Sequence, residues 1–146
     1  MPLHLFASGC DAPNRRGTAT NYHLLDDASL IEQLQAYNGT PPEILAHQEF
    51  MQLLLPTIRA DFALAETYRY RSGPTLGIPL TVFAGREDDI ETPEQVQGWQ
   101  EETDGPFAVQ WFDGDHFFIN TNQQEVLVAI EAALANLLRP SRRIHG

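Results

Sequence analysis

The sequence predicts an α/β fold with three short parallel strands and helices packed around them. Three apolar runs of strand length, each followed by polar turn residues, support the prediction: residues 3–7, 78–84 and 107–112. The segments between and after these runs carry apolar residues at helical spacing. Short apolar strands that alternate with helices are typical of a parallel sheet covered by helices.

Composition limits the classes of function. A chain of 146 residues with 42% hydrophobic residues forms at most one domain with a substantial core. The net charge of −11 argues against a nucleic-acid partner. No apolar run approaches the length of a membrane span, and the start of the chain lacks the layout of a secretion signal. We therefore expect a cytoplasmic protein without a membrane partner.

The region after the first strand is predicted to be helical. A polar loop at residues 15–22 precedes a helix capped by Asp26, a short helical turn ending at Leu45, and a long helical pattern over residues 47–70. Pro56 should kink or divide the long helix. Because these helices stand between the first and second strands, we expect residues 15–72 to form an insertion above the strand ends.

The second half of the chain is predicted to contain a helix after the second strand, a turn after the third strand and a final helix. After the second strand, residues 93–102 are expected to form a helix with Val96 and Trp99 facing inward. Asp113, Gly114 and Asp115 form a turn after the third strand. The last helix carries apolar residues at helical spacing over residues 126–138, which we expect to be its buried face, and residues 139–146 are expected to form a frayed tail.

Chemistry is predicted at two strand ends. Three acids, Glu87, Asp88 and Asp89, follow the second strand, and His116 follows the third. Ligands bind outside the carboxyl ends of strands in open α/β sheets, where an acid could orient the imidazole and support its protonated form. The pair has the Asp…His chain order of an α/β-hydrolase triad. The residues alone leave open which acid takes part, and whether His116 is only a turn residue.

The chain resembles type II thioesterases, the stand-alone α/β hydrolases that accompany non-ribosomal peptide and polyketide synthases. The resemblance spans nearly the whole chain and follows a series of short motifs in order: Leu5-Phe6-Ala7-Ser8-Gly9, Gly39-Thr40-Pro41-Pro42-Glu43, Leu53-Leu54-Leu55-Pro56, Arg59-Ala60-Asp61-Phe62, Glu66-Thr67-Tyr68, Pro79 to Gly85, Gly105-Pro106-Phe107 and Gly114-Asp115-His116-Phe117-Phe118. It implies that the chain is the C-terminal part of an α/β-hydrolase fold, with residues 15–72 as a helical lid.

The same resemblance assigns roles and a substrate. The family's Gly-x-x-Asp pattern selects Asp88 as the acid, and the family histidine falls on His116. Members use a Ser-Asp-His triad to remove acyl groups from the phosphopantetheine arm of acyl or peptidyl carrier proteins, as part of antibiotic biosynthesis. No cofactor is implied.

One departure from the family pattern concerns the nucleophile. The serine of the family lies in a Gly-x-Ser-x-Gly elbow upstream of the matched region, and these 146 residues contain no such motif. We therefore expect a truncated fragment that is inactive alone and that could pair with an N-terminal thioesterase half.

Two alternative functions remain. One is a non-catalytic remnant that binds a carrier protein or a complementing half, and the other is a different serine α/β hydrolase, an esterase or an acyltransferase. A metal site at Asp113, Asp115 and His116 is not favoured, because Phe118 and Gln124 stand where a calcium loop needs glycine and glutamate.

Overall fold

The computed structural model describes residues 2–16, 20–37 and 39–138. It divides the chain into two compact units, one formed by Met1–Arg16 with Ser72–Gly146 and the other by Gly17–Arg71. The second unit covers nearly the residues of the predicted insertion, whose role as a lid stays a prediction. The expected frayed tail at residues 139–146 and part of the expected polar loop, residues 17–19, lie outside the described residues.

The first unit is built on a parallel sheet of three strands, as predicted. The strands are β1 (Leu5–Ser8), β2 (Leu80–Gly85) and β3 (Phe107–Phe112), and their spatial order is β1-β2-β3. In the register of the sheet, Leu5 pairs with Leu80, which in turn pairs with Phe107. The expected start of the first strand at Leu3 is wrong. Strand pairing begins where the Leu5 N–H donates to the Pro79 carbonyl at 2.9 Å, and Leu3 is 68% exposed.

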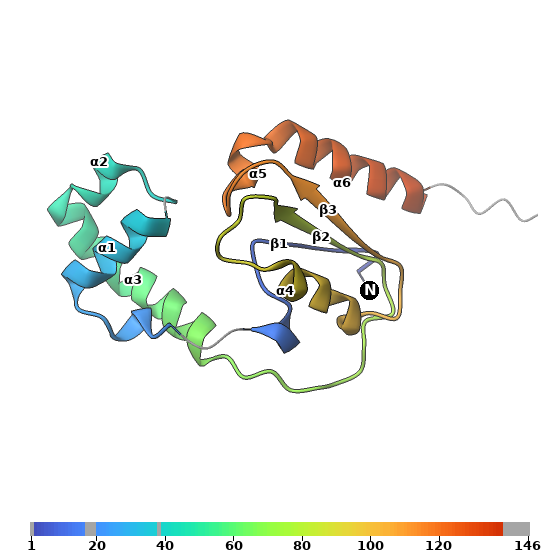
Figure 1. Ribbon diagram of the computed structural model, residues 1–146, viewed down its shortest axis with the longest axis horizontal. Coiled ribbons are helices and arrows are strands. Elements are labelled where there is room, and N and C mark those ends of the chain that lie inside the picture. The colour runs from blue at the N-terminus through green and yellow to red at the C-terminus, as the bar shows by residue number, and fades with distance from the viewer. Residues whose placement is uncertain (1, 17–19, 38, 139–146) are drawn as a thin grey trace, which may run out of the picture. The chain divides into compact units, whose positions relative to one another are not determined.

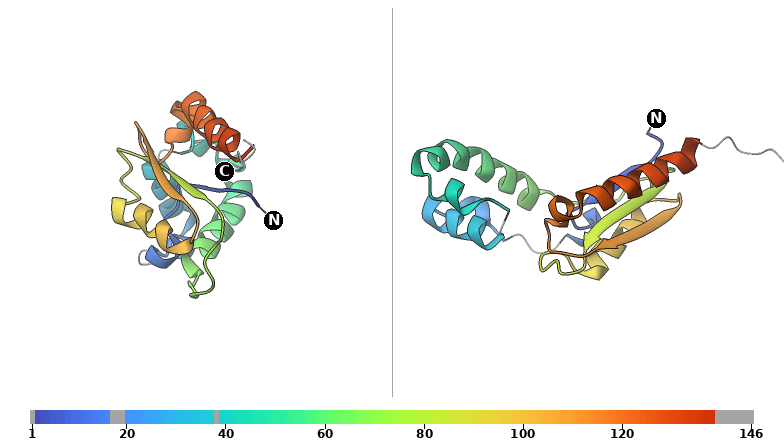
Figure 2. Two further views of the ribbon diagram at one scale, coloured as in Figure 1. Left: turned by 90° about the vertical axis from the view of Figure 1, so that its right-hand side faces the viewer. Right: turned by 90° about the horizontal axis from the view of Figure 1, so that it is seen from above.

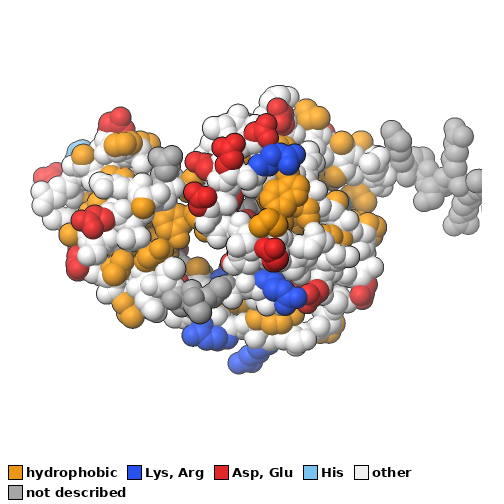
Figure 3. Space-filling model, viewed as in Figure 1, with side chains coloured by type: hydrophobic (Ala, Val, Ile, Leu, Met, Phe, Trp, Pro, Cys, Tyr) orange, Lys and Arg blue, Asp and Glu red, His pale blue; other side chains and the backbone are white. Residues whose placement is uncertain are grey.

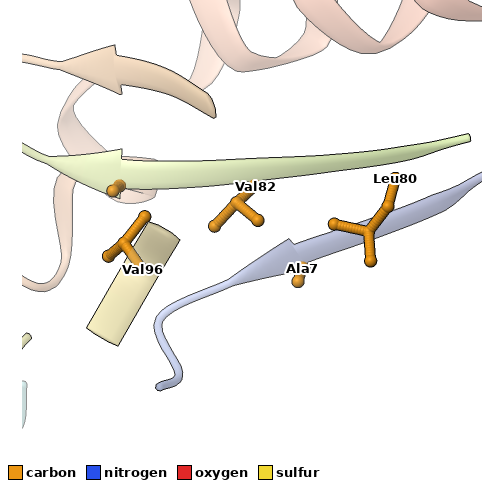
Figure 4. Packing of buried hydrophobic residues seen from close by; sticks show 5 residues of the cluster. Ala7, Leu80, Val82 and Val96 are labelled. Atoms are coloured by element: carbon orange, nitrogen blue, oxygen red, sulfur yellow. The ribbon is translucent and has the colours of Figure 1, made fainter. Parts of the chain in front are cut away.

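Helices cover both faces of this sheet (Figures 1 and 2). On one face, α4 (Pro93–Gln97) places Val96 against Ala7, Leu80, Val82 and Ala84, and these residues form a buried cluster (Figure 4). On the other face, α5 (Phe118–Thr121) and α6 (Gln123–Leu138) pack around a second cluster of Phe83, Phe112 and Phe118. Neighbouring positions of β2 point to opposite faces, so this strand supplies both clusters.

Two helices of this unit differ from their predicted form. The helix expected over residues 93–102 ends at Gln97 and continues as a tighter 3-10 helix, η3 (Gly98–Glu102), whose Trp99 indole N–H donates to the Cys10 carbonyl at 3.0 Å. On α6, only part of the expected buried face packs against the sheet. Leu127 and Leu134 are 47% and 42% exposed because Val126, Ala129 and Ile130 make the contact with the phenylalanine cluster. Apolar side chains are visible at the molecular surface in Figure 3.

The second unit is helical. It contains η2 (Tyr22–Leu24), α1 (Asp27–Tyr37), α2 (Pro42–Leu45) and α3 (Gln48–Thr67), while η1 (Pro13–Arg15) belongs to the first unit. The expected cap is present, since Asp26 Oδ1 accepts the Ser29 N–H at 2.9 Å. The helix α3 runs through Pro56 without division. Its buried side chains complete a core that is shared with α1 and α2: Leu30, Leu45, Met51 and Leu55.

A buried acid fastens the start of this unit to α3. The Glu66 carboxylate, with its side chain 7% exposed, accepts hydrogen bonds from the Thr20 hydroxyl, from the Tyr22 and His23 N–H groups and from the His23 ring. Arg59, about two helical turns earlier on α3, donates to the carbonyls of His23 and Leu25. Burial by itself would raise the pKa of Glu66, but the hydrogen bonds outweigh it and hold the pKa at about 2.

Among the described residues, none of the helices combines the length and the apolar character that crossing a membrane requires.

Candidate active site

Asp88 lies in a loop whose following backbone N–H groups fold back and donate to the Asp88 carboxylate. Its Oδ1 accepts the backbone N–H groups of Ile90 at 2.7 Å and Glu91 at 3.2 Å, and the side chain is only 2% exposed. Bonds of this kind to the residues just ahead are a common property of aspartate in turns. Directly afterwards, a capping box between Thr92 and Gln95 starts α4. The loop therefore holds the Asp88 carboxylate rigidly at the carboxyl end of β2.

The turn before His116 is fastened to the same loop. The Arg86 N–H donates to the Phe112 carbonyl at 2.9 Å, and the Glu87 N–H donates to the Gly114 carbonyl at 3.0 Å. This approach requires glycine at position 85, where a Cβ atom would lie 2.5 Å from the Asp115 carbonyl oxygen and 2.6 Å from that of Gly114. The backbone thus brings the ends of β2 and β3 together independently of the side chains of Asp88 and His116.

The two loops bring Asp88 and His116 into contact. The Nδ1 atom of His116 lies 2.9 Å from Asp88 Oδ2, and the imidazole is 20% exposed. Since a carboxylate only accepts hydrogen bonds, Nδ1 carries the proton, and the neutral ring presents an unprotonated Nε2. That edge of the ring faces the end of β1, where a Cβ atom at Gly9 would lie 3.8 Å from Nε2. The pair can therefore accept a proton at Nε2 and support the resulting charge from Oδ2.

The three acids considered from the sequence differ in their surroundings. Of these, Asp88 contacts His116, whereas Glu87 and Asp89 are exposed. The sequence thus pointed to the two loops whose side chains are in contact, and the catalytic roles of Asp88 and His116 stay predictions.

Sequence reasoning missed Glu91. This residue is 6% exposed, and its carboxylate lies beside the pair, with one atom of each of Asp88, Glu91 and His116 within 4.8 Å of the others. Burial raises the pKa of Glu91 to about 7, with a further contribution from the Asp88 charge. No pattern in the sequence distinguishes Glu91 from the exposed acids before it, because its burial results from the curled Asp88 loop.

The atoms of this trio are close enough to share a metal ion, but Asp88 is already occupied. Its two oxygens accept three hydrogen bonds, so only one lone pair, on Oδ2, is left for a cation. The metal site considered from the sequence at Asp113, Asp115 and His116 is not supported by the contacts of its two acids. Asp113 lies 3.1 Å from the Arg86 guanidinium and Asp115 accepts the Phe117 N–H at 2.8 Å.

The two neighbours of Gly9 in the sequence, Ser8 and Cys10, carry a hydroxyl and a thiol, the groups that act as nucleophiles in hydrolases. Ser8 is exposed at the end of β1, and Cys10 is half-buried two residues later. Burial raises the pKa of the Cys10 thiol, and the nearby Glu91 charge adds to the effect. An activated thiol needs the opposite shift. Cys10 is therefore better explained as a packing residue whose carbonyl receives the Trp99 indole N–H.

A parallel sheet with an acid after one strand, a histidine after the next and a hydrogen bond between them defines an α/β-hydrolase type of fold. The chain belongs to the thioesterase family, because the family model described as "Thioesterase domain" matches residues 1–134. The resemblance to type II thioesterases of non-ribosomal peptide and polyketide pathways is thereby confirmed, as is the α/β-hydrolase class of the fold.

Named relatives agree with this assignment. The gramicidin S biosynthesis protein GrsT of Aneurinibacillus migulanus is 37% identical over 139 residues, which are 95% of this chain and 54% of GrsT. The type II thioesterase BorB of the borrelidin cluster is 38% identical, with a TM-score of 0.80 over 93% of this chain and 54% of BorB. ClbQ of the colibactin pathway is 28% identical, with a TM-score of 0.86 over 94% of this chain and 58% of ClbQ. The chain thus spans about half the length of the relatives it matches.

Proposed function

We propose that the chain supplies the acid and the base of a thioesterase that removes acyl groups from phosphopantetheine carrier proteins of non-ribosomal peptide or polyketide synthesis. The hydrogen bond between Asp88 and His116, at 2.9 Å in a chain of the thioesterase family, carries the proposal. The acyl or peptidyl carrier protein would be the partner, and the cytoplasm the place of action. No cofactor is needed for this chemistry.

In the proposed reaction, His116 Nε2 takes the proton of a serine hydroxyl as the serine oxygen attacks the thioester carbonyl. The protonated imidazole then gives that proton to the departing phosphopantetheine thiolate, so that a thiol leaves and an acyl-serine remains. In the second half, His116 takes a proton from the water that attacks the acyl-serine and returns it to the serine oxygen as the acyl–oxygen bond breaks, so that the free acid departs. Asp88 keeps Nδ1 protonated throughout and stabilises the imidazolium with its buried carboxylate.

The serine and the oxyanion-hole donors would come from a segment outside these 146 residues, since the chain has no Gly-x-Ser-x-Gly motif. The purified chain alone should then show negligible hydrolysis of acyl-thioester substrates. The lid role of residues 15–72 belongs to the same proposal. In the described sheet β1 is an edge strand, and such an edge can pair with a strand of another chain. This supports a second candidate function, that of a complementing fragment that binds an N-terminal thioesterase half without being catalytic itself.

Complementation tests the proposal and separates these functions. The chain is co-purified with the separately expressed N-terminal half of a related type II thioesterase, and release of acid from an acyl-phosphopantetheine carrier protein is measured. Hydrolysis that depends on both halves and is lost with His116→Ala supports the proposal. A stable complex with no hydrolysis supports a binding role alone. Hydrolysis of simple esters but not of the carrier-bound thioester would favour another serine hydrolase.

The isolated chain provides the decisive control. Steady turnover by this chain without a partner, abolished by His116→Ala, would mean that a nucleophile lies within the 146 residues. Ser8→Ala and Cys10→Ala would then identify it, because both residues flank Gly9, whose Cβ would lie 3.8 Å from Nε2.

A further inference from the structure

Glu91 occupies a position that the proposed mechanism does not use. Two hydrogen bonds to Asp88 Oδ1 curl the loop, so that the Glu91 side chain returns to the Asp88–His116 pair. Among the residues that the structure describes, none donates a hydrogen bond to either carboxylate oxygen of Glu91, although both oxygens are buried. A buried carboxylate without a donor is costly when charged. Its proton therefore depends closely on the charges around it.

Those charges come from three loops of the same unit. Asp88 on its own loop and Asp11 after β1 both disfavour the charged form of Glu91, whereas His116 after β3 favours it. The Cys10 thiol also responds to the Glu91 charge. Asp11 is in turn held by the Gln95 amide at 2.8 Å, which fixes the β1 loop against the start of α4. The acids thus oppose ionisation of Glu91 while the imidazole promotes it, so the protons on Glu91 and His116 are coupled.

We propose that Glu91 is a positioning residue that acts through His116, forming with Asp88 a three-membered acid–base cluster in place of a simple pair. When Glu91 is neutral, the imidazole has one carboxylate partner. When Glu91 is ionised, a second negative charge lies beside the ring and strengthens its hold on a proton. Such mutual influence is reciprocal and makes both groups titrate as a coupled set.

The consequence for catalysis rests on the proposed thioesterase function. Because His116 must both take and release a proton, a charge that strengthens its hold favours proton uptake and disfavours release to the leaving thiolate. Because the pKa of Glu91 is about 7, Glu91 changes from its neutral to its ionised form near neutral pH, and the hold of His116 on its proton changes with it. Glu91 would therefore set the pH at which the base works best, without touching the substrate.

The first experiment needs no catalysis. The 146-residue chain is labelled with ¹³C and ¹⁵N, and the Glu91 carboxyl and His116 ring signals are followed by NMR from pH 4 to pH 9. We expect the Glu91 carboxyl to titrate near neutral pH and the His116 ring to show two steps. A Glu91 midpoint at the ordinary value of a solvated glutamate would overturn the proposal, and this measurement requires no variant to fold.

Two substitutions then test the coupling. Glu91→Gln keeps the shape of the side chain and removes its charge, so the His116 titration should become a single step with a midpoint lower by about one pH unit. Asp89→Asn, which neutralises an exposed acid of the same loop, should leave the His116 curve unchanged. A His116 curve that is the same in Glu91→Gln as in the unaltered chain would also overturn the proposal.

The pH–rate profile of the complemented enzyme links the cluster to activity. Glu91→Gln should move the profile to lower pH, and Glu91→Asp should restore part of the original position. The two proposals fail separately. Coupled titration without any hydrolysis would contradict the proposed function and leave the cluster intact, whereas hydrolysis with an unshifted profile in Glu91→Gln would contradict the cluster.

Discussion

Asp88 holds His116 with one carboxylate oxygen while the other oxygen is committed to the backbone of its own loop. Oδ2 lies 2.9 Å from His116 Nδ1, and Oδ1 accepts the N–H groups of Ile90 and Glu91. The carboxylate therefore cannot rotate to serve the ring with its other oxygen without breaking the loop. Its side chain, 2% exposed, is shielded from water that would compete for the imidazole.

The first prediction separates two adjacent acids in the complemented enzyme. Asp88→Asn should lower kcat by about three to four orders of magnitude, because an amide at this position no longer enforces the tautomer that leaves Nε2 free. Asp89→Asn should change kcat little, since Asp89 is exposed. Steady-state kinetics on the two variants provide the comparison. A larger loss with Asp89→Asn would mean that the wrong acid has been assigned.

The second prediction concerns the backbone contact that joins the two loops. Gly85→Ala would place a methyl group 2.5 Å from the Asp115 carbonyl oxygen, and backbone cannot yield as a flexible side chain can. We expect a loss of about 1–3 kcal/mol in the free energy of unfolding and a displaced His116 ring. Gly77→Ala is the matched control, because its Cβ would meet no atom within 4 Å. Equal unfolding temperatures for the two variants would contradict the close approach.

Local sequence patterns suffice to predict the sheet and the two loops that carry Asp88 and His116. The three apolar runs end in turn residues, and the Gly85-x-x-Asp88 spacing is a short-range feature that survives in the folded chain. The family resemblance then reduces three neighbouring acids to Asp88, the one that contacts His116 in the structure. Because β2 and β3 are parallel neighbours, the loops after their carboxyl ends lie at the same edge of the sheet, which brings Asp88 and His116 together.

Features that depend on tertiary packing could not be predicted in this way. The burial of Glu91 follows from the loop that folds around Asp88, and the exposed Leu127 shares its helical periodicity with the packed Ile130. The neighbouring strand decides where β1 starts. The Pro79 carbonyl accepts the Leu5 N–H, but Pro79 has no N–H that could extend the pairing toward the N-terminus of β1. In each case the neighbour, and not the local pattern, determines the outcome.

The third prediction concerns acid stability of the helical unit. The pKa of Glu66 is about 2, against an ordinary value of 4.5, so its contribution to stability is complete above pH 4.5 and is lost as the pH falls toward 2. At pH 7, Glu66→Gln should cost about 2–3 kcal/mol in the free energy of unfolding. Asp61→Asn, an exposed position on the same helix, serves as control. Thermal unfolding at pH 3 should show a smaller difference between Glu66→Gln and the unaltered chain than at pH 7.

The fourth prediction has the opposite sign. The pKa of Glu91 is raised from 4.5 to about 7, so its contribution to stability is complete below pH 4.5 and is lost as the pH rises through 7. Glu91→Gln, which cannot ionise, should therefore be more stable than the unaltered chain at pH 8, by about 1–3 kcal/mol. At pH 4 the two should unfold at similar temperatures. A variant that is less stable at pH 8 would indicate a donor to the Glu91 carboxylate.

The last prediction concerns the open edge of the sheet. Within the described part of the chain, β1 pairs with β2 alone, so one side of its backbone has no strand partner. Leu3, just before β1, is 68% exposed, and α6 adds exposed apolar side chains at Leu127 and Val128. An unpaired edge invites pairing with another strand, and exposed apolar side chains add to the tendency to associate. The net charge of −11 opposes bulk aggregation but cannot satisfy an unpaired strand.

We therefore expect the chain alone to self-associate or to be only marginally stable. Analytical ultracentrifugation combined with thermal unfolding measures both properties. Leu3→Lys should shift the population toward monomer, because a lysine at a strand edge disfavours pairing. Leu24→Lys is the matched control in the helical unit, where Leu24 is 72% exposed and lies outside every strand. A monodisperse monomer that unfolds cooperatively at an ordinary mesophilic temperature would show that the β1 edge needs no partner.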